Sequence, residues 1–279
     1  MTGWLLASVA LGGAWTRDQG EVYTKAAVDV YGASRVRVAG ELEDSDGRYL
    51  GTQVSTYGEV GLSKGHPVQA TASVPLVVGA HRTQIYDVFG ELPVRATTVR
   101  MGDLRLGLQT ALLPTAPEAP VALAGELKLP LYANGRVGSS LPTYAELFPR
   151  PGDGNIDGTA WLLGGASRGA WFVEGGAGYL RRTEWFIGWD PEGVAYEDGG
   201  VARAKVGWRA GPVLLIGAVD AVWAWRPGPT TREALTWSLS GWVELSDHWA
   251  LEPRVATETW VRNASQGTSG GLGLSWRTR

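Results

Sequence analysis

Apolar and polar residues alternate along the chain with a period of two. Between Val22 and Tyr31, small or apolar residues occupy every even position, while Tyr23, Lys25 and Asp29 occupy odd ones. Successive side chains of a β-strand point to opposite faces, so this pattern predicts a strand with one apolar face and one polar face.

The same alternation returns along the rest of the chain. The candidate strands are Val22–Tyr31, Val54–Leu62, Val68–Val78, Leu104–Leu112, Val121–Leu129, Asp157–Ala166, Trp171–Tyr179, Ala202–Arg209, Leu215–Trp223, Trp237–Leu245, Trp249–Glu258 and Leu272–Trp276. Beyond the N-terminus the longest apolar runs are Val74–Ala80 and Val213–Val219. A membrane-spanning helix needs about 20 apolar residues, so the pattern predicts an all-β protein.

The connections between these strands alternate in length. The short ones are Ser63–Pro67, Pro114–Pro120, Ser167–Gly169, Ala210–Pro212 and Ser246–His248. The others, mostly longer, are Gly32–Tyr49, Gly79–Met101, Leu131–Gly154, Arg182–Gly199, Arg226–Glu233 and Arg262–Gln266. This arrangement predicts a single 12-stranded antiparallel transmembrane β-barrel of the bacterial outer membrane, with short periplasmic turns and long extracellular loops.

Aromatic residues on the apolar face fall at strand ends. We expect them to form two belts at the membrane interfaces, in contact with the lipid bilayer and lipopolysaccharide: Trp171, Trp208, Trp249 and Trp276 at the short-turn side, and Tyr179, Trp223 and Trp237 at the long-loop side. The alternative, a soluble all-β protein with one wet face, would bury its tryptophans centrally.

The N-terminal segment Met1–Trp15 is apolar and has no charged side chain before Arg17. It resembles the apolar core and small-residue end of a signal peptide, although no Lys or Arg precedes it. We therefore assign residues 1–14 to a signal peptide, which a start placed too late would have truncated, and residues 15–279 to the barrel domain. The alternative is a short first strand or helix.

Composition excludes several kinds of chemistry. The 279 residues include 40 Gly and 14 Trp but no Cys, and the three His are scattered, so we expect no metal site and no cofactor. The net charge of −3 gives no electrostatic case for binding nucleic acid. Residues 153–158 match the start of a calcium loop, but Gly164 stands where its Glu belongs, which favours a simple turn.

If the apolar face meets lipid, the polar face lines the lumen. Its charged residues are Lys25, Asp29, Glu59, Asp103, Arg105, Glu126, Lys128, Glu174, Arg203, Lys205, Arg209, Asp220, Glu244, Glu252, Arg254 and Glu258. They could form a transport path with charge selectivity, or ion-paired rungs that fill the lumen.

Inward aromatic residues offer a second chemistry for the lumen. They are Tyr23, Tyr57, Trp161, Phe172, Trp242 and Trp260. Twelve strands lie between the eight that leave room for side chains only and the sixteen or more that enclose a water channel. The aromatic residues could line a path for an aromatic solute or fill space around the charges.

Three apolar segments stand out in the predicted long loops: Ile85–Phe89, Tyr144–Phe148 and Trp185–Trp189. Such loops could fold inward and gate the barrel, contact lipopolysaccharide, collect a hydrophobic substrate, or pack on one another.

Short motifs along nearly the whole chain resemble one family of outer-membrane barrels. The motifs are GAWTRDQGEVY at Gly13–Tyr23, GDLRLGL at Gly102–Leu108, ELKLP at Glu126–Pro130, GDGNIDG at Gly152–Gly158 and LIGAVDAV at Leu215–Val222. The family is named for the meta-pathway of phenol degradation. The resemblance implies a 12-stranded barrel with a role in aromatic uptake and without catalytic residues. The chain departs from many such barrels in continuing to Arg279 after its final aromatic, Trp276.

Three functions follow from these observations. The first is a passive channel for a small, hydrophobic or aromatic molecule, inserted by the outer-membrane assembly machinery. The second is a non-conducting structural or surface-interaction barrel with a plugged lumen and binding loops. The third, an integral-membrane hydrolase, rests only on Ser63 and His66 lying close together in one turn, with no third partner. We expect that the protein is not an enzyme.

Overall fold

The computed structural model describes residues 13–38, 41–64, 66–87, 90–113, 118–132, 152, 154–186, 196–228 and 231–278. The strands are β1 (Val22–Val38), β2 (Glu41–Gly61), β3 (Val68–Asp87), β4 (Gly90–Met101), β5 (Asp103–Ala111), β6 (Val121–Pro130), β7 (Asn155–Arg168), β8 (Trp171–Phe186), β9 (Gly199–Ala210), β10 (Val213–Ala224), β11 (Glu233–Glu244), β12 (Trp249–Arg262) and β13 (Ala264–Arg277). No helix among the described residues is long and apolar enough to cross a membrane.

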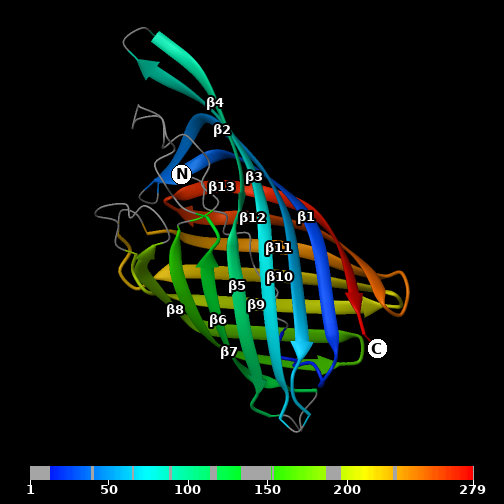
Figure 1. Ribbon diagram of the computed structural model, residues 1–279. Helices are drawn as coiled ribbons and strands as arrows, with labels where there is room; N and C mark the ends of the chain where they lie inside the picture. Colours follow the sequence, from blue (N-terminus) through cyan, green and yellow to red (C-terminus); the bar gives the residue numbers. More distant parts are fainter. Residues whose placement is uncertain are drawn as a thin grey trace.

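The strands form one closed antiparallel barrel (Figure 1). Each strand from β5 to β13 pairs with the next along the chain, and β1 pairs with β13 and β2. The pairing of β2 with β3 completes the ring. This confirms the predicted all-β, antiparallel barrel.

Strands β4 and β5 share one position in the wall, so the barrel is 12-stranded. β4 pairs with Leu76–Asp87, the half of β3 on the long-loop side. β5 pairs with Val68–Ser73, the half of β3 on the short-turn side. They are separated at Gly102, whose amide donates to the carbonyl of Pro75 over 2.7 Å. Pro75 has no amide hydrogen to contribute to the ladder, and the extra residue opposite it forms a bulge.

The strands extend much further than the alternation predicts. Residues 32–49 and 79–101, expected as long loops, belong largely to the β1–β2 and β3–β4 hairpins, and the β3–β4 hairpin rises beyond the rim in Figure 1. The loop expected at Arg262–Gln266 is a tight turn in which only Asn263, with φ 52°, separates β12 from β13. Beyond the membrane no apolar face is required, so backbone pairing continues without the alternation that reveals a strand in the sequence.

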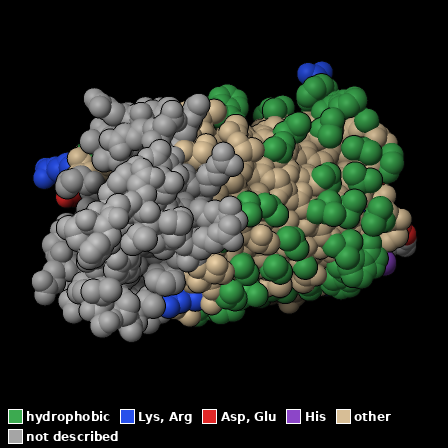
Figure 2. Space-filling view, turned by 90° about the horizontal axis from the view of Figure 1, so that it is seen from above, with side chains coloured by type: hydrophobic (Ala, Val, Ile, Leu, Met, Phe, Trp, Pro, Cys, Tyr) green, Lys and Arg blue, Asp and Glu red, His purple; other side chains and the backbone are tan. Residues whose placement is uncertain are grey.

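The apolar face of the strands is the outside of the barrel. Val28, Leu108, Leu162 and Leu239 are each between 46% and 59% exposed, and Figure 2 shows hydrophobic side chains spread over the outer wall. The opposite face is occupied by polar and aromatic side chains, several of them buried. The barrel therefore places its apolar surface outward and its polar and aromatic side chains in the lumen.

Candidate functional site: the lumen and the segment that enters it

The segment before β1 lies inside the barrel. Ala14 is fully buried in an apolar cluster formed by inward side chains of three strands: Ala122, Ala124, Trp161, Leu163 and Val201. Trp15 packs edge-to-face on Phe172 with ring centroids 5.9 Å apart. The ring occupies space that a Cβ at Gly165 would fill. Residues 13–15 thus fill part of the lumen beside β6–β9.

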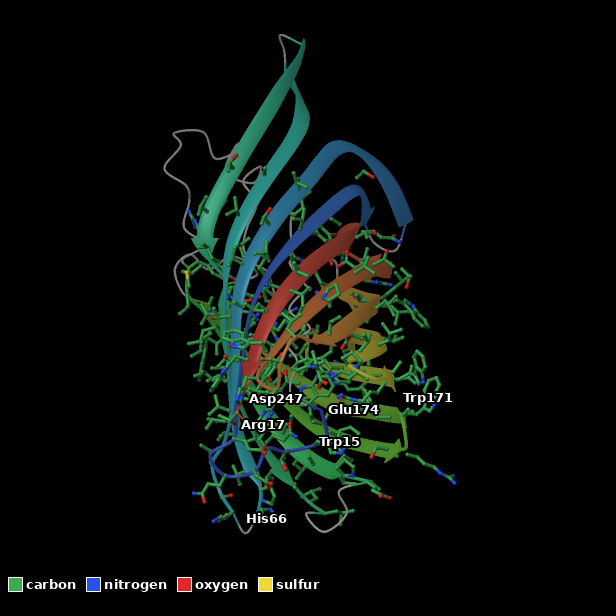
Figure 3. All side chains as sticks on the ribbon, turned by 90° about the vertical axis from the view of Figure 1, so that its right-hand side faces the viewer. Trp15, Arg17, His66, Trp171, Glu174 and Asp247 are labelled. Carbon is green, nitrogen blue, oxygen red and sulfur yellow. The ribbon has the colours of Figure 1, made fainter. Side chains whose placement is uncertain are left out.

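Polar contacts hold the same segment. Gln109 Nε2 donates to the carbonyl oxygen of Gly13 over 2.7 Å, and the amide of Arg17 donates to Gln69 Oε1 over 2.9 Å. The guanidinium of Arg17 forms an ion pair with Glu59. Figure 3 shows Trp15, Arg17 and Glu174 within the barrel, whereas Trp171 points away from it.

The domain boundary predicted from the sequence falls within this lumenal segment. Gly13 and Ala14 belong to the part assigned to the signal peptide, and the preceding residues lie outside the described ranges. Nothing in the alternation of apolar and polar residues predicts that this segment lies in the lumen. Arg17, the first charge after the apolar run, was the signal that could have located it.

The charged residues predicted to line the lumen lie on the inner face, and most of them form ion pairs there. Three of the pairs below join adjacent strands, and the other three reach across one intervening strand. The pairs are Lys25 Nζ with Glu252 Oε2 (2.7 Å), Arg254 Nε with Asp29 Oδ1 (3.8 Å), Arg105 Nη1 with Glu126 Oε1 (2.7 Å), Lys205 Nζ with Glu174 Oε1 (3.2 Å), Arg203 Nε with Asp220 Oδ1 (3.6 Å) and Arg209 Nη1 with Glu244 Oε1 (3.1 Å). Asp103 accepts a hydrogen bond of 3.0 Å from the Tyr132 hydroxyl.

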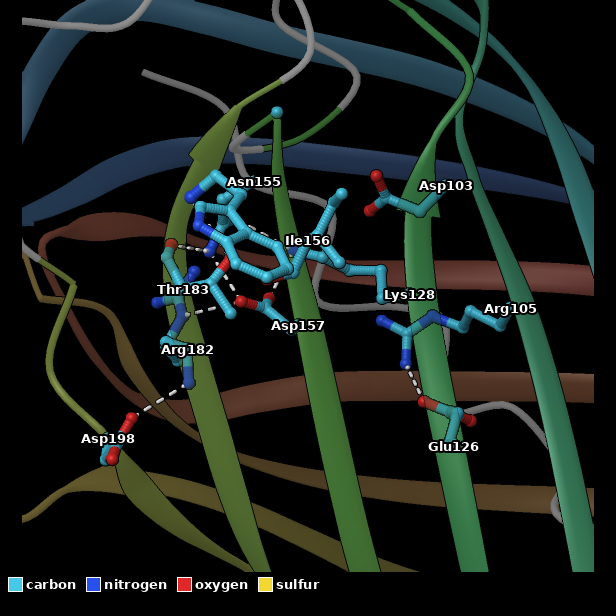
Figure 4. Close-up of polar contacts among 12 residues, drawn as sticks. Asp103, Arg105, Glu126, Lys128, Asn155, Ile156, Asp157, Arg182, Thr183 and Asp198 are labelled. Atoms are coloured by element: carbon cyan, nitrogen blue, oxygen red, sulfur yellow. Dashed lines mark hydrogen bonds and ion pairs between the residues drawn. The ribbon is translucent and has the colours of Figure 1, made fainter.

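A denser network connects β6, β7 and β8 (Figure 4). Asp157 forms ion pairs with Lys128 and, over 3.7 Å, with Arg182, while Lys128 Nζ donates to Asn155 Oδ1 over 3.0 Å. All four residues are at most 9% exposed. Asn155 and Asp157 come from the calcium-like motif, and here they bind side chains of the protein itself.

A cavity of about 220 Å³ lies in the lumen on the side of β1–β3 and β9–β13. Its cationic lining residues are Lys25, Arg203, Lys205 and Arg254, and its anionic ones are Asp29, Asp220 and Glu252. Gln53 and several serines complete its polar surface. The lumen is therefore divided between an apolar part filled by the N-terminal segment and a charged, hollow part.

Most of the predicted inward aromatic residues do face the lumen. The guanidinium of Arg203 lies over the ring of Trp161, with its Cζ 4.7 Å from the ring centroid. Trp242 stacks on Tyr23 at 5.8 Å, and Tyr23 meets Tyr57 at 6.0 Å. Tyr23, Tyr57 and Trp242 surround the short-turn end of the lumen, whereas Trp161 is opposite Gly178, at the level of Tyr179 near the long-loop side.

Trp260 is on the opposite face from the one predicted. The pairing shifts from Trp260 with Leu235 to Glu258 with Thr236, so β12 contains an extra residue at this bulge. An extra residue reverses the faces of those beyond it. Trp260, 36% exposed, lies on the outer face with Trp237, and fully buried Val261 takes the inward place.

The predicted interface aromatics lie on the outer face. Trp171, Tyr179, Trp208, Trp237 and Trp249 are 40–56% exposed, and Trp223 and Trp276 are partly exposed. Eight residues separate Trp171 from Tyr179, about 26 Å along a strand and about 20 Å in height once strand tilt is included. Trp185 and Trp225 are also highly exposed, at 72% and 56%. Trp185 begins the predicted apolar segment Trp185–Trp189, whose residues 187–189 lie outside the described ranges, and Trp225 is not among the predicted interface aromatics.

Trp171 and Trp208 are expected to stabilise the barrel as a pair. They are directly opposed in the β8–β9 register, with ring centroids 6.1 Å apart. Such pairs contribute about 1 kcal/mol beyond their separate burial. A double-mutant cycle with alanine, measured by urea unfolding in lipid, should give a coupling of this size. Purely additive effects would contradict a direct ring contact.

Three hydrogen-bond donors converge on the carboxylate of Asp198 at the long-loop rim. Its carboxylate accepts hydrogen bonds from Tyr179 Oη, from Arg181 Nη1 over 2.6 Å and from the amide of Arg182 over 2.9 Å. Partial burial raises the pKa of Asp198, but these donors outweigh it and the pKa lies below its usual value. This contact therefore contributes stability above the unfolded-state pKa and loses it as the pH falls.

The Ser63–His66 turn does not have the geometry of a catalytic dyad. The hydroxyl of Ser63 donates to the backbone carbonyl of His66 and not to its imidazole ring. Both residues lie in the short-turn rim, where His66 is exposed.

Comparison with known proteins identifies the fold. The barrel superimposes on the COG4313 outer membrane channel from Pseudomonas putida F1 with a TM-score of 0.70, at 10% sequence identity, covering 96% of this chain and 98% of that one. This is the fold of a bacterial outer-membrane β-barrel. No family model and no curated protein sequence matches the chain.

Two autotransporter barrels are also similar to this outer-membrane barrel. The translocator domain of NalP from Neisseria meningitidis has a TM-score of 0.53 at 15% identity, covering 94% of this chain and 90% of that one. The transport unit of AIDA-I from Escherichia coli has a TM-score of 0.50 at 9% identity, with coverages of 93% and 91%. At these identities the likeness concerns the fold alone.

Proposed function

We propose that the protein is a passive channel of the bacterial outer membrane for a small solute, with hydrophobic or aromatic molecules as the candidate class. One observation carries this proposal: a closed barrel with an apolar outer wall encloses a cavity of about 220 Å³ that is lined by charged groups. A cavity of this size gives a small solute room inside the barrel.

Aromatic side chains support the proposed solute class. Tyr23, Tyr57 and Trp242 form a contiguous group at the short-turn end of the lumen. Aromatic faces bind planar solutes by offset or edge-to-face contact. The resemblance to the phenol-degradation family, whose role is aromatic uptake, points in the same direction.

A second candidate function is favoured by the segment in the lumen. Residues 13–17 are held by apolar, hydrogen-bond and ionic contacts, as a plug would be. A barrel plugged in this way would be a structural or surface-interaction protein, in contact with lipopolysaccharide through its long hairpins. Ionic conductance separates the two functions.

The test is single-channel recording of the refolded full chain in a planar lipid bilayer. A channel should give steady, discrete openings, and Lys205→Gln should shift the permeability ratio towards cations. Removing one charge at about 10 Å in water changes an ion's energy by about 0.4 kcal/mol, or about twofold in permeability. Arg181→Gln, on the outer face, is the matched control. A stably inserted barrel without openings would favour the second function.

A further inference from the structure

The guanidinium of Arg17 occupies a site formed by the barrel wall. Its Nε donates to Glu59 Oε2, and its carbon lies 4.9 Å from the ring centroid of Tyr23. The hydroxyl of Tyr57 donates to Glu59 Oε1 over 2.7 Å, which holds the carboxylate in place. A carboxylate beside an aromatic face is the chemistry that recognises an organic cation.

Among the carboxylates at this end of the lumen, Glu59 takes its cation from the N-terminal segment, whereas Glu252 and Glu244 are paired with cations of the strands. Lys25 is bound to Glu252 over 2.7 Å, and Arg277 to Glu244 over 3.0 Å. Both cations belong to the wall and stay with it. The ion pair of Glu59, by contrast, comes from a residue outside the strands.

Release of the segment would leave Glu59 without its cation. With the segment docked, the side chain of Glu59 is 5% exposed, and losing the cation at this poorly solvated position is unfavourable for the carboxylate. A cationic solute arriving in the lumen removes that cost by taking the place of Arg17. A neutral or anionic solute does not.

From this geometry we propose that the lumen has a binding site for a small organic cation, an amine, amidine or guanidine, formed by Glu59, Tyr23 and Tyr57. Arg17 is its tethered occupant, and a cationic solute exchanges with it. The inference rests on the proposed channel function and narrows its solute class to molecules that carry a positive charge.

The experiment measures block of the refolded full-length channel by benzamidinium, a planar aromatic cation. A tethered competitor acts at an effective concentration in the millimolar range, so Arg17→Gln should lower the blocking concentration by about tenfold or more. In the double variant Arg17→Gln/Glu59→Gln, the blocking concentration of benzamidinium should no longer be lowered. Benzamide, the neutral isostere, should block the wild type and both variants at the same concentration.

Arg181→Gln removes an outer-face arginine and serves as the matched control, with block unchanged from wild type. Equal block of wild type and Arg17→Gln, or tight block that persists in the double variant, would overturn the cation site while leaving the channel itself intact.

A second readout does not depend on conductance. Benzamidinium should raise the midpoint of thermal unfolding of Arg17→Gln, because a ligand of the folded state stabilises it by mass action. It should have little effect on the double variant. Absence of any conductance together with this shift would refute the channel but retain the cation site, whereas absence of the shift would refute the site.

Discussion

Replacing Trp15 with alanine is expected to raise the open probability of the barrel about 30-fold. Trp15 packs on Phe172 in the space left by Gly165, and it anchors the lumenal segment next to fully buried Ala14. Truncating a largely buried aromatic removes about 2 kcal/mol of apolar contact, equivalent to about 30-fold in the equilibrium between docked and released segment.

Single-channel recording of Trp15→Ala measures this change directly. Trp185→Ala is the matched control, because the side chain of Trp185 is 72% exposed and little buried contact is lost with it. Open probability should rise in the first variant alone. If it is the same in both variants, the segment does not limit passage through the barrel.

Replacing Asp157 with alanine is expected to lower the free energy of unfolding by about 3–4 kcal/mol, because it leaves two buried cations without their shared anion. Lys128 and Arg182 are 7% and 9% exposed, and Asp157 lies between them. Asn155 would still accept a hydrogen bond from Lys128, but an amide oxygen supplies no compensating charge.

Urea unfolding of the barrel refolded in lipid gives the required free energies. Adding Lys128→Met to Asp157→Ala should recover part of the loss, since it removes one of the two cations that pair with Asp157. Arg181→Gln, which breaks the exposed pair with Asp198, should cost less than 1 kcal/mol. A loss below 1 kcal/mol for Asp157→Ala would mean that lumenal water replaces the carboxylate effectively.

The bilayer explains why so much of the fold could be read from the sequence. A strand in contact with lipid on one side must place apolar residues at every second position, as at Val28 and Leu108. The same constraint fixes which charges face inward, so neighbouring strands could be expected to pair Arg105 with Glu126 and Lys205 with Glu174.

The period-two alternation does not predict the structure where the bilayer imposes no constraint on the residues. The long-loop halves of β1–β3 and all of β4 carry no required apolar face, so the alternation of residues predicts loops there. The bulge in β12 is a change of backbone register that leaves no mark in the alternation, and it turned Trp260 outward.

The sequence by itself determined the membrane-spanning part of the strands, most of their lipid-facing and lumen-facing residues, and the barrel that they close. Only the tertiary structure decided that Ala14, Trp15 and Arg17 lie inside that barrel. The reason is physical: period two follows from local strand geometry and one lipid-facing side, and each membrane-spanning strand segment carries it. The place of the N-terminal segment depends on the shape of a cavity assembled from distant strands, including the space at Gly165 and the carboxylate of Glu59.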